Sequence, residues 1–231
     1  MNKTWQLFSL FGHKVFLTPS FLIVCAVLAF WGVNSLSGLL SGALIIPVLF
    51  VGILLHELGH AAASKRFGYG HSEIMFWGLG GVAINRYRGR RNNKHNIAIS
   101  LAGPAVSALL GIASGGALYA YTGALSSGST LLGEFLYLMM TLNIFWAVFN
   151  LLPIHPMDGG QAMLSGLKIA LKDTQKAIKM TAYISFAAIA LGLGAYSLLL
   201  GRVDVTIGLF GAYFAYMNYK MLREGREVRM M

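Results

Sequence analysis

The sequence predicts an all-α polytopic membrane protein with about six transmembrane helices and a small membrane-associated β-hairpin or sheet. Hydrophobic residues make up 56% of the 231-residue chain and charged residues only 11%, whereas about a quarter of the residues in an ordinary globular chain are charged. A soluble monomer of this composition would have too little polar surface to cover itself. Apolar runs long enough to cross a bilayer, at roughly 20 residues each, account for more than half of the chain.

Six apolar runs emerge when the chain is read in windows of about 20 residues. They lie near residues 19–36, 42–64, 97–121, 131–152, 177–200 and 203–222. The connections within the first pair and within the last pair are short, so the helices of each pair must form a tight hairpin. We expect one transmembrane domain over residues 1–231.

The placement of the basic residues supports this topology. In membrane proteins, the loops on the cytoplasmic side carry an excess of Lys and Arg. With six spans, all but one of the 18 Lys and Arg residues of this chain fall on the same side of the membrane. Only Arg202 falls on the other side. The sequence therefore predicts an integral membrane protein, surrounded by lipid, with both termini in the cytoplasm. Because topology accounts for the positive charge, no nucleic-acid partner is expected.

Residues 72–85 predict a β-hairpin within the longest stretch that does not span the membrane. They are rich in aromatic and β-branched residues around a glycine-rich turn, which is typical of a hairpin. A short strand is also expected before Pro19, where Val15 and Leu17 alternate with other residues. The hairpin could be an ordinary surface turn, or it could offer an edge strand to an extended peptide.

The second apolar run ends with the sequence His56-Glu57-Leu58-Gly59-His60. Positions i and i+4 of a helix share a face, so both imidazoles can bind one metal ion, and Glu57 is close enough to act on a water at that ion. This is the arrangement of a zinc hydrolase. Ionisable residues inside a span are costly unless they are used or paired, which disfavours a polar cluster that only ties helices together.

A catalytic zinc ion generally has three protein ligands and one open position, so a third ligand is required. His155 and Asp158 follow the fourth run on the basic side, where the second run also ends. Asp158 is favoured, because prolines and glycines keep the backbone irregular there, and such backbone at membrane depth must line a cavity or be buried in protein. His71 and Glu73 stay open as alternatives, although their place in the hairpin loop favours a solvated loop residue over a ligand for each.

These motifs together resemble the site-2 protease family of intramembrane zinc metalloproteases. The His56 to His60 motif is followed by Asn150-Leu-Leu-Pro153 running into Asp158-Gly159-Gly160, and Ala102-Gly103-Pro104 and the glycines of residues 78–82 also look like family features. The resemblance covers nearly the whole chain.

The resemblance implies a role for each matching residue. His56, His60 and Asp158 would bind one zinc ion, and Glu57 would be the catalytic base. Asn150 would hold the substrate, and the hairpin residues Gly80, Gly81 and Val82 would lie beside it. His155 is unusual within the second motif, and the chain is expected to contain neither a PDZ nor a CBS domain, so regulation through either is in doubt.

The implied activity is hydrolysis of peptide bonds within or next to transmembrane segments of membrane proteins, as in regulated intramembrane proteolysis. A membrane-bound transcription regulator or its inhibitor would be a suitable substrate. The implied location is a prokaryotic plasma membrane, with the active site toward the cytoplasm.

The alternative is a non-proteolytic metal-binding membrane protein or a metal transporter. A transporter would be expected to carry several ligands at the midplane of different helices, and often a histidine-rich loop, and the sequence has neither pattern. A catalytically inactive relative could lose the glutamate between the histidines, but Glu57 is present.

Overall fold

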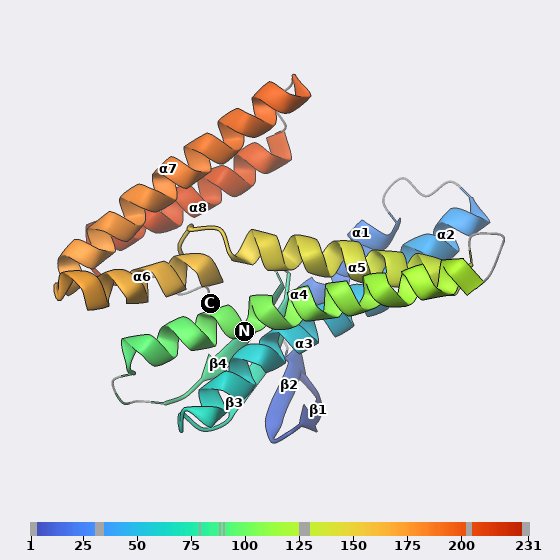
Figure 1. Cartoon of the computed structure of the whole chain (residues 1–231), viewed down its shortest axis with the longest axis horizontal. Helices are drawn as coiled ribbons and strands as arrows, with labels where there is room; N and C mark the ends of the chain where they lie inside the picture. The colour runs from blue at the N-terminus through green and yellow to red at the C-terminus, as the bar shows by residue number, and fades with distance from the viewer. Residues whose placement is uncertain are drawn as a thin grey trace. The chain divides into compact units, whose positions relative to one another are not determined.

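The computed structural model describes residues 4–30, 35–78, 80–87, 89, 91–124, 130–201 and 205–227. The chain divides into two compact units, which are described separately. The first unit comprises Met1–Gly89 and Ala102–Val148, and the second comprises Arg90–Leu101 and Phe149–Met231. The described residues are mostly helical with one small sheet (Figure 1), which confirms the predicted fold class.

The sheet belongs to the first unit and has the strand order β1-β2-β3-β4. Its strands are β1 (Trp5–Leu10), β2 (His13–Leu17), β3 (Ser72–Trp77) and β4 (Gly80–Asn85). Antiparallel pairing joins β1 to β2 and β3 to β4, whereas β2 and β3 run parallel. The hairpin predicted over residues 72–85 is therefore confirmed, and β2 is the strand predicted before Pro19. β4 lies at an edge of this sheet.

The helices of the first unit are α1 (Pro19–Phe30), α2 (Leu36–Ala43), α3 (Ile45–Arg66), most of α4 (Asn93–Ala124) and nearly all of α5 (Leu131–Asn150). The strands β3 and β4 pack on α3. The core between the sheet, α1 and α3 is apolar and consists of Val15, Leu17, Phe21, Cys25, Ile53, Leu54, Leu58, Ile74 and Phe76. This core fixes the hairpin against the half of α3 that carries the histidines.

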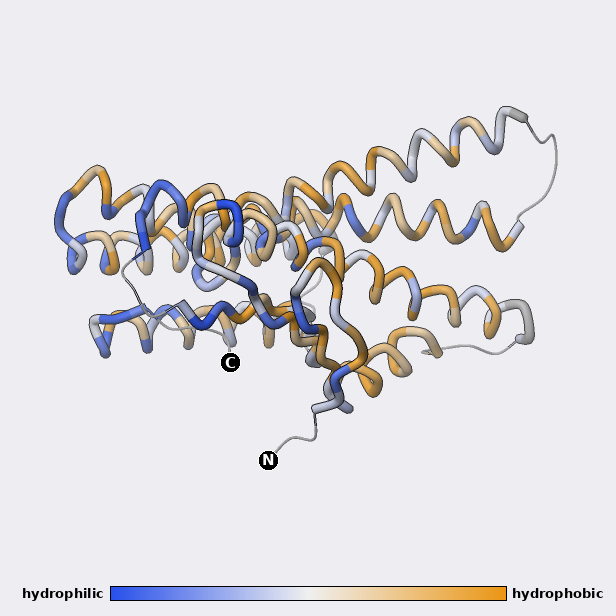
Figure 2. The backbone as a smooth tube through the Cα atoms, turned by 90° about the horizontal axis from the view of Figure 1, so that it is seen from below, coloured by the Kyte–Doolittle hydropathy of each residue, from blue (hydrophilic) through white to orange (hydrophobic). Residues whose placement is uncertain are grey.

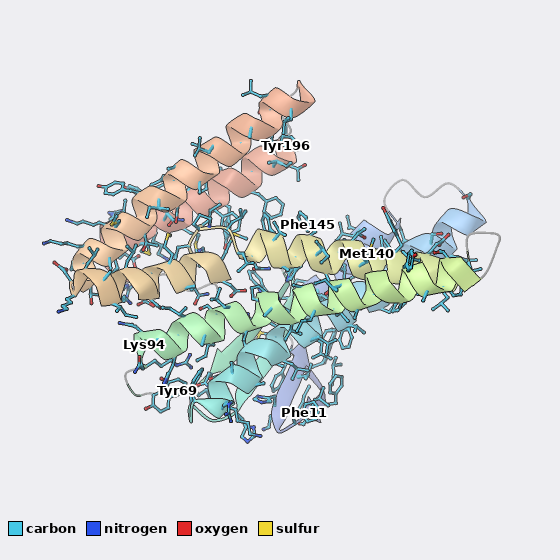
Figure 3. The ribbon with its side chains drawn as sticks, viewed as in Figure 1. Phe11, Tyr69, Lys94, Met140, Phe145 and Tyr196 are labelled. Carbon is cyan, nitrogen blue, oxygen red and sulfur yellow. The ribbon has the colours of Figure 1, made fainter. Side chains whose placement is uncertain are left out.

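Glycines allow α4 and α5 to approach closely. A methyl group placed on Gly111 would lie 2.7 Å from Ile144 Cγ1, and one on Gly115 would lie 3.0 Å from Met140 Sδ. Met140 thus lies against α4 (Figure 3), whereas Phe145 on the same helix is 58% exposed. The contacts agree with the expectation that small residues bring membrane helices together.

The second unit contains α6 (Asp158–Leu171), α7 (Thr174–Leu200) and α8 (Val205–Glu224). The helices α7 and α8 lie alongside each other (Figure 1). Asp173 caps α7 by accepting hydrogen bonds from the main-chain N–H groups of Gln175 and Lys176, as N-cap residues do. The apolar core that joins the three helices consists of Leu164, Ala177, Ile178, Ala182, Met217 and Met221. The sequence prediction treats residues 153–179 only as a connection, so α6 was missed.

Four stretches of helix are long and apolar enough to cross a membrane, and Figure 2 shows the hydrophobic colouring along them. They are Gly38–Arg66, Asn93–Gly123, Leu131–Asn150 and Thr174–Leu199, which match four of the six predicted runs. The predicted count of six is not confirmed. α1 has only 12 residues, and α8 carries tyrosines, glycines, Asn218 and Lys220 that lower its hydropathy. Arg202, on which the topology prediction partly depends, lies outside the described residues.

Candidate metal centre

The helix α3 places His56 and His60 one turn apart on the same face, as their spacing predicts. The two imidazole Nε2 atoms are 3.2 Å apart, and the rings lie nearly perpendicular to each other. In a tetrahedral site with Zn–N distances of about 2.0–2.1 Å, two ligand nitrogens lie about 3.3–3.4 Å apart. The pair therefore has the spacing that two imidazole ligands of one zinc ion require.

The helix α4 supplies a partner for the far side of His56. Ser107 is fully buried, and its Oγ lies 3.0 Å from His56 Nδ1. When a histidine binds a metal through one ring nitrogen, the other nitrogen usually donates a hydrogen bond that fixes the ring and its tautomer. Ser107 Oγ can accept that bond from His56 Nδ1, which leaves the lone pair of Nε2 toward His60.

Gly103, on the same face of α4 as Ser107, keeps space beside the two imidazoles. A methyl group there would lie 2.3 Å from His60 Nε2 and 2.8 Å from His56 Nε2. On α3, a methyl group at Gly59 would lie 2.8 Å from the main-chain oxygen of Ala102. The Ala102-Gly103-Pro104 sequence therefore has a direct reason in the packing of α4 on the histidine-bearing turn of α3.

Glu57 lies between the histidines and is buried, with 6% of its surface exposed. The strand β4 passes beside it: a methyl group on Gly81 would lie 2.7 Å from Glu57 Cγ and 3.0 Å from Glu57 Oε1. The neighbouring Gly80 has φ of 133°, a region that favours glycine. The structure thus brings the predicted residues His56, Glu57, His60, Gly80 and Gly81 into one place.

Val82 belongs to the same strand and pairs with Met75 of β3. Two of the alternative ligands lie at the other end of this hairpin and have other contacts. Glu73 Oε2 accepts a hydrogen bond from Arg86 Nη2 at 2.8 Å, and the His71 ring packs edge-on against that of His13.

The remaining predicted residues belong to the second unit. Asn150 is the last residue of α5, and Asp158 is the first residue of α6. Gly159 and Gly160 fit closely under the segment before them: a methyl group on Gly160 would lie 2.4 Å from the His155 main-chain nitrogen. The glycines of the second motif therefore let the first turn of α6 fold back on residues 151–155.

His155 lies in this segment and is buried, with 3% of its surface exposed. Burial lowers the pKa of its imidazole from 6.5 to about 4, against a smaller opposite effect from Glu227. The ring is therefore neutral at neutral pH. Its main chain is hydrogen-bonded on both sides, by Ser185 at the nitrogen and by Asn218 at the oxygen.

Sequence reasoning missed Ser107, Ser185 and Asn218. The sequence could have indicated Ser107, because this residue lies four positions after Gly103 and therefore on the same face of the helix. For Ser185 and Asn218 there was no such signal, because each meets His155 only through the packing of separate helices.

Comparisons with known proteins point the same way as these motifs. A sequence model described as peptidase family M50 matches residues 115–193. A zinc metalloprotease of Methanocaldococcus jannaschii is 29% identical over 225 residues, which cover 92% of this chain and 60% of that protein. Stage IV sporulation protein FB of Bacillus subtilis is 32% identical over 129 residues, which cover 54% of this chain and 41% of that protein.

A solved structure is also similar over almost the full length. The site-2 protease from Methanocaldococcus jannaschii matches with a TM-score of 0.61 and 26% sequence identity, covering 99% of this chain and 98% of that one. The chain spans 60% and 41% of the two curated relatives named above.

Proposed function

We propose that the chain, which is similar in sequence and fold to the site-2 protease family, is an intramembrane zinc metalloprotease. It hydrolyses peptide bonds within or next to transmembrane segments of membrane proteins. The observation that carries this proposal is the pair of Nε2 atoms of His56 and His60, 3.2 Å apart on an apolar helix, with Glu57 between them and Ser107 behind His56.

The proposed zinc ligands are His56, His60 and Asp158. Each offers one ligand atom, an imidazole nitrogen or a carboxylate oxygen, and three protein ligands leave the open position that a catalytic zinc needs. When bound, zinc supplies a Lewis acid that polarises the scissile carbonyl and activates a water. Glu57 accepts a proton from that water and later delivers it to the leaving amine.

We propose that the substrate pairs with the edge strand β4. A transmembrane helix hides its peptide bonds in its own hydrogen bonds, so the substrate must unwind locally before attack. An unwound segment can add to a sheet edge through main-chain hydrogen bonds, and Gly81 of β4 lies directly against Glu57. Gly80, Gly81 and Val82 therefore form the proposed substrate strand, and Asn150 is a further proposed substrate contact.

The proposed setting follows from the charge distribution and the family. The chain lies in a prokaryotic plasma membrane with both termini and the active site toward the cytoplasm, and residues 1–231 act as one protease domain. The proposed substrates are membrane proteins such as a membrane-bound transcription regulator or its inhibitor.

The test combines zinc content with cleavage of a model transmembrane substrate by the wild type and by Glu57→Gln. The variant should keep its zinc and lose at least about 10²- to 10⁴-fold in rate, the usual contribution of acid–base catalysis. Near-normal cleavage by Glu57→Gln would contradict the assignment of the base. Zinc binding without cleavage by the wild type, together with zinc flux in proteoliposomes, would instead favour a metal transporter.

A further inference from the structure

The segment before α6 is held by one side chain from each of the two long helices of the second unit. Ser185 Oγ on α7 accepts a hydrogen bond from the main-chain N–H of His155 at 3.0 Å. Asn218 Nδ2 on α8 donates to the main-chain oxygen of His155 at 2.6 Å. Both polar groups of one residue's main chain are thus bound by side chains from separate helices. We call this arrangement, formed by Ser185, Asn218 and the His155 main chain, the His155 tether.

Apolar packing surrounds the tether and gives it a fixed position. Ile154 and Met157, on either side of the tethered residue, are buried against Ile189 of α7 and Phe214 of α8. Ser185 and Ile189 are four residues apart, as are Phe214 and Asn218, so each helix presents its polar and apolar contacts on one face. The segment therefore rests on a continuous surface of α7 and α8.

The tether is connected to Asp158 by a tight stretch of chain. The main-chain N–H of Met157 donates to the oxygen of Ile154 at 2.9 Å, and α6 begins at the next residue, Asp158. Gln161 Nε2 donates to the oxygen of Pro156 at 2.9 Å, which ties the first turn of α6 to the same segment. A displacement of the His155 main chain is therefore transmitted to the Asp158 carboxylate.

The buried polar groups in and around the tether lower the stability of the fold, and apolar packing of the same segment would not have this cost. Within the described part of the chain, three buried side-chain atoms have no hydrogen-bond partner: His155 Nδ1, Thr181 Oγ1 and Asn218 Oδ1. Thr181 lies one turn before Ser185 on α7 and accepts the Ser185 hydroxyl through its main-chain oxygen. All three atoms thus belong to the tether or its immediate surroundings. Buried polar atoms without partners are destabilising, so an apolar contact would seat the segment more stably.

We propose that Ser185 and Asn218 are positioning residues that set the Asp158 carboxylate for zinc binding through the His155 main chain. This inference rests on the proposed function, in which Asp158 is a zinc ligand. Neither side chain needs to touch the metal or the substrate. Their role is to fix the position of Asp158, the proposed zinc ligand that does not belong to α3, through contacts from α7 and α8.

The test measures zinc affinity of the full chain in detergent, by competition with a chromophoric chelator. Ser185→Ala removes the hydroxyl that accepts the His155 N–H, and Asn218→Leu removes the donor to the His155 oxygen at similar volume. Each variant should bind zinc more weakly, by up to about the 10- to 100-fold that follows removal of a group bonded directly to a metal ligand. Ser185→Thr keeps a hydroxyl and should stay closer to the wild type.

A second readout follows the metal geometry without catalysis. In the cobalt-substituted protein, the visible absorption of Co²⁺ reports the number and arrangement of ligands. Ser185→Ala and Asn218→Leu should change this spectrum in the same sense as Asp158→Ala, whereas a variant that only loses stability should not change it.

Met221→Ala is the matched control, because Met221 is fully buried on α8 and packs in an apolar cluster. It should lower the unfolding temperature but leave zinc affinity and the cobalt spectrum unchanged. If Ser185→Ala and Asn218→Leu also keep wild-type zinc affinity while Asp158→Ala loses zinc, the tether has only a structural role and the inference is wrong. If Asp158→Ala itself keeps zinc, the ligand assignment in the proposed function fails as well.

Discussion

Removing the Ser107 hydroxyl should weaken zinc binding. Ser107 Oγ lies 3.0 Å from His56 Nδ1, and both residues are buried. Ser107→Ala deletes one oxygen atom and leaves only a small cavity, but the buried His56 Nδ1–H loses this acceptor, which costs about 1–3 kcal/mol of folding free energy. His56 loses the group that fixes its tautomer and ring orientation, so the Nε2 lone pair is no longer held toward the metal.

The expected loss in zinc affinity is about 10- to 100-fold, which corresponds to about 1.4–2.8 kcal/mol of binding free energy. A competition titration with a chromophoric chelator measures the affinity, and cleavage of a model transmembrane substrate at rising zinc concentration measures its consequence. Because the variant keeps Glu57 and all proposed ligands, saturating zinc should restore much of the activity. The variant should therefore need a higher zinc concentration for half-maximal activity, whereas its activity at saturating zinc should change much less.

Ser114→Ala is the matched control, since Ser114 is also buried on α4, seven residues after Ser107. It should leave zinc affinity unchanged. Equal zinc affinity in Ser107→Ala and the wild type would refute the reasoning, because the His56 ring would then be oriented by the helix packing alone.

Three further predictions concern other parts of the site. Gly103→Ala places a methyl group 2.3 Å from His60 Nε2, so it should abolish zinc binding as measured by metal content. Gly81→Ala places one 2.7 Å from Glu57 Cγ; cleavage should fall while zinc content stays at the wild-type level, and loss of zinc would show that the hairpin supports the metal instead. His155 takes up a proton near pH 6.5 when unfolded but only near pH 4 when folded, so the free energy of unfolding should fall by up to about 3 kcal/mol as the pH drops through this window. Denaturation of the wild type and His155→Gln at several pH values should show a shallower fall in the variant.

The sequence predicted best those features whose residues lie close together along the chain. His56 and His60 are four residues apart, so helix geometry alone brings their nitrogens together. The hairpin β3–β4 was likewise predicted, because its strands adjoin and its turn is rich in glycine. Asp158 and Asn150 lie far along the chain from His56. Asp158 was favoured as the third ligand because of the irregular backbone around it, whereas the role of Asn150 came only from the resemblance of two short motifs to a known family.

Features that depend on distant segments could not be predicted in this way. The parallel pairing of β2 with β3 joins residues almost 60 positions apart. Nothing in the sequence of either strand indicates which other strand it pairs with. The span count came from apolar windows of about 20 residues, which do not show where a helix ends and which included a run whose tyrosines, glycines, Asn218 and Lys220 lower its hydropathy. The short α1 and the tyrosine-containing α8 are the two predicted spans that the structure does not confirm.

The proposed zinc ligands differ in what fixes their positions, and this explains why they were not equally easy to find. His56 and His60 lie inside a helix of 22 residues, so their spacing hardly depends on the rest of the chain. Asp158 is the first residue of α6, where the free N–H groups and the positive end of the helix dipole favour a carboxylate anion, the form that binds a metal. Its position depends on a segment seated on α7 and α8 through the main chain of His155, and sequence spacing does not report such a contact. Sequence spacing places His56 and His60 about one turn apart on a helix. It does not by itself decide whether His155 or Asp158 is the third ligand.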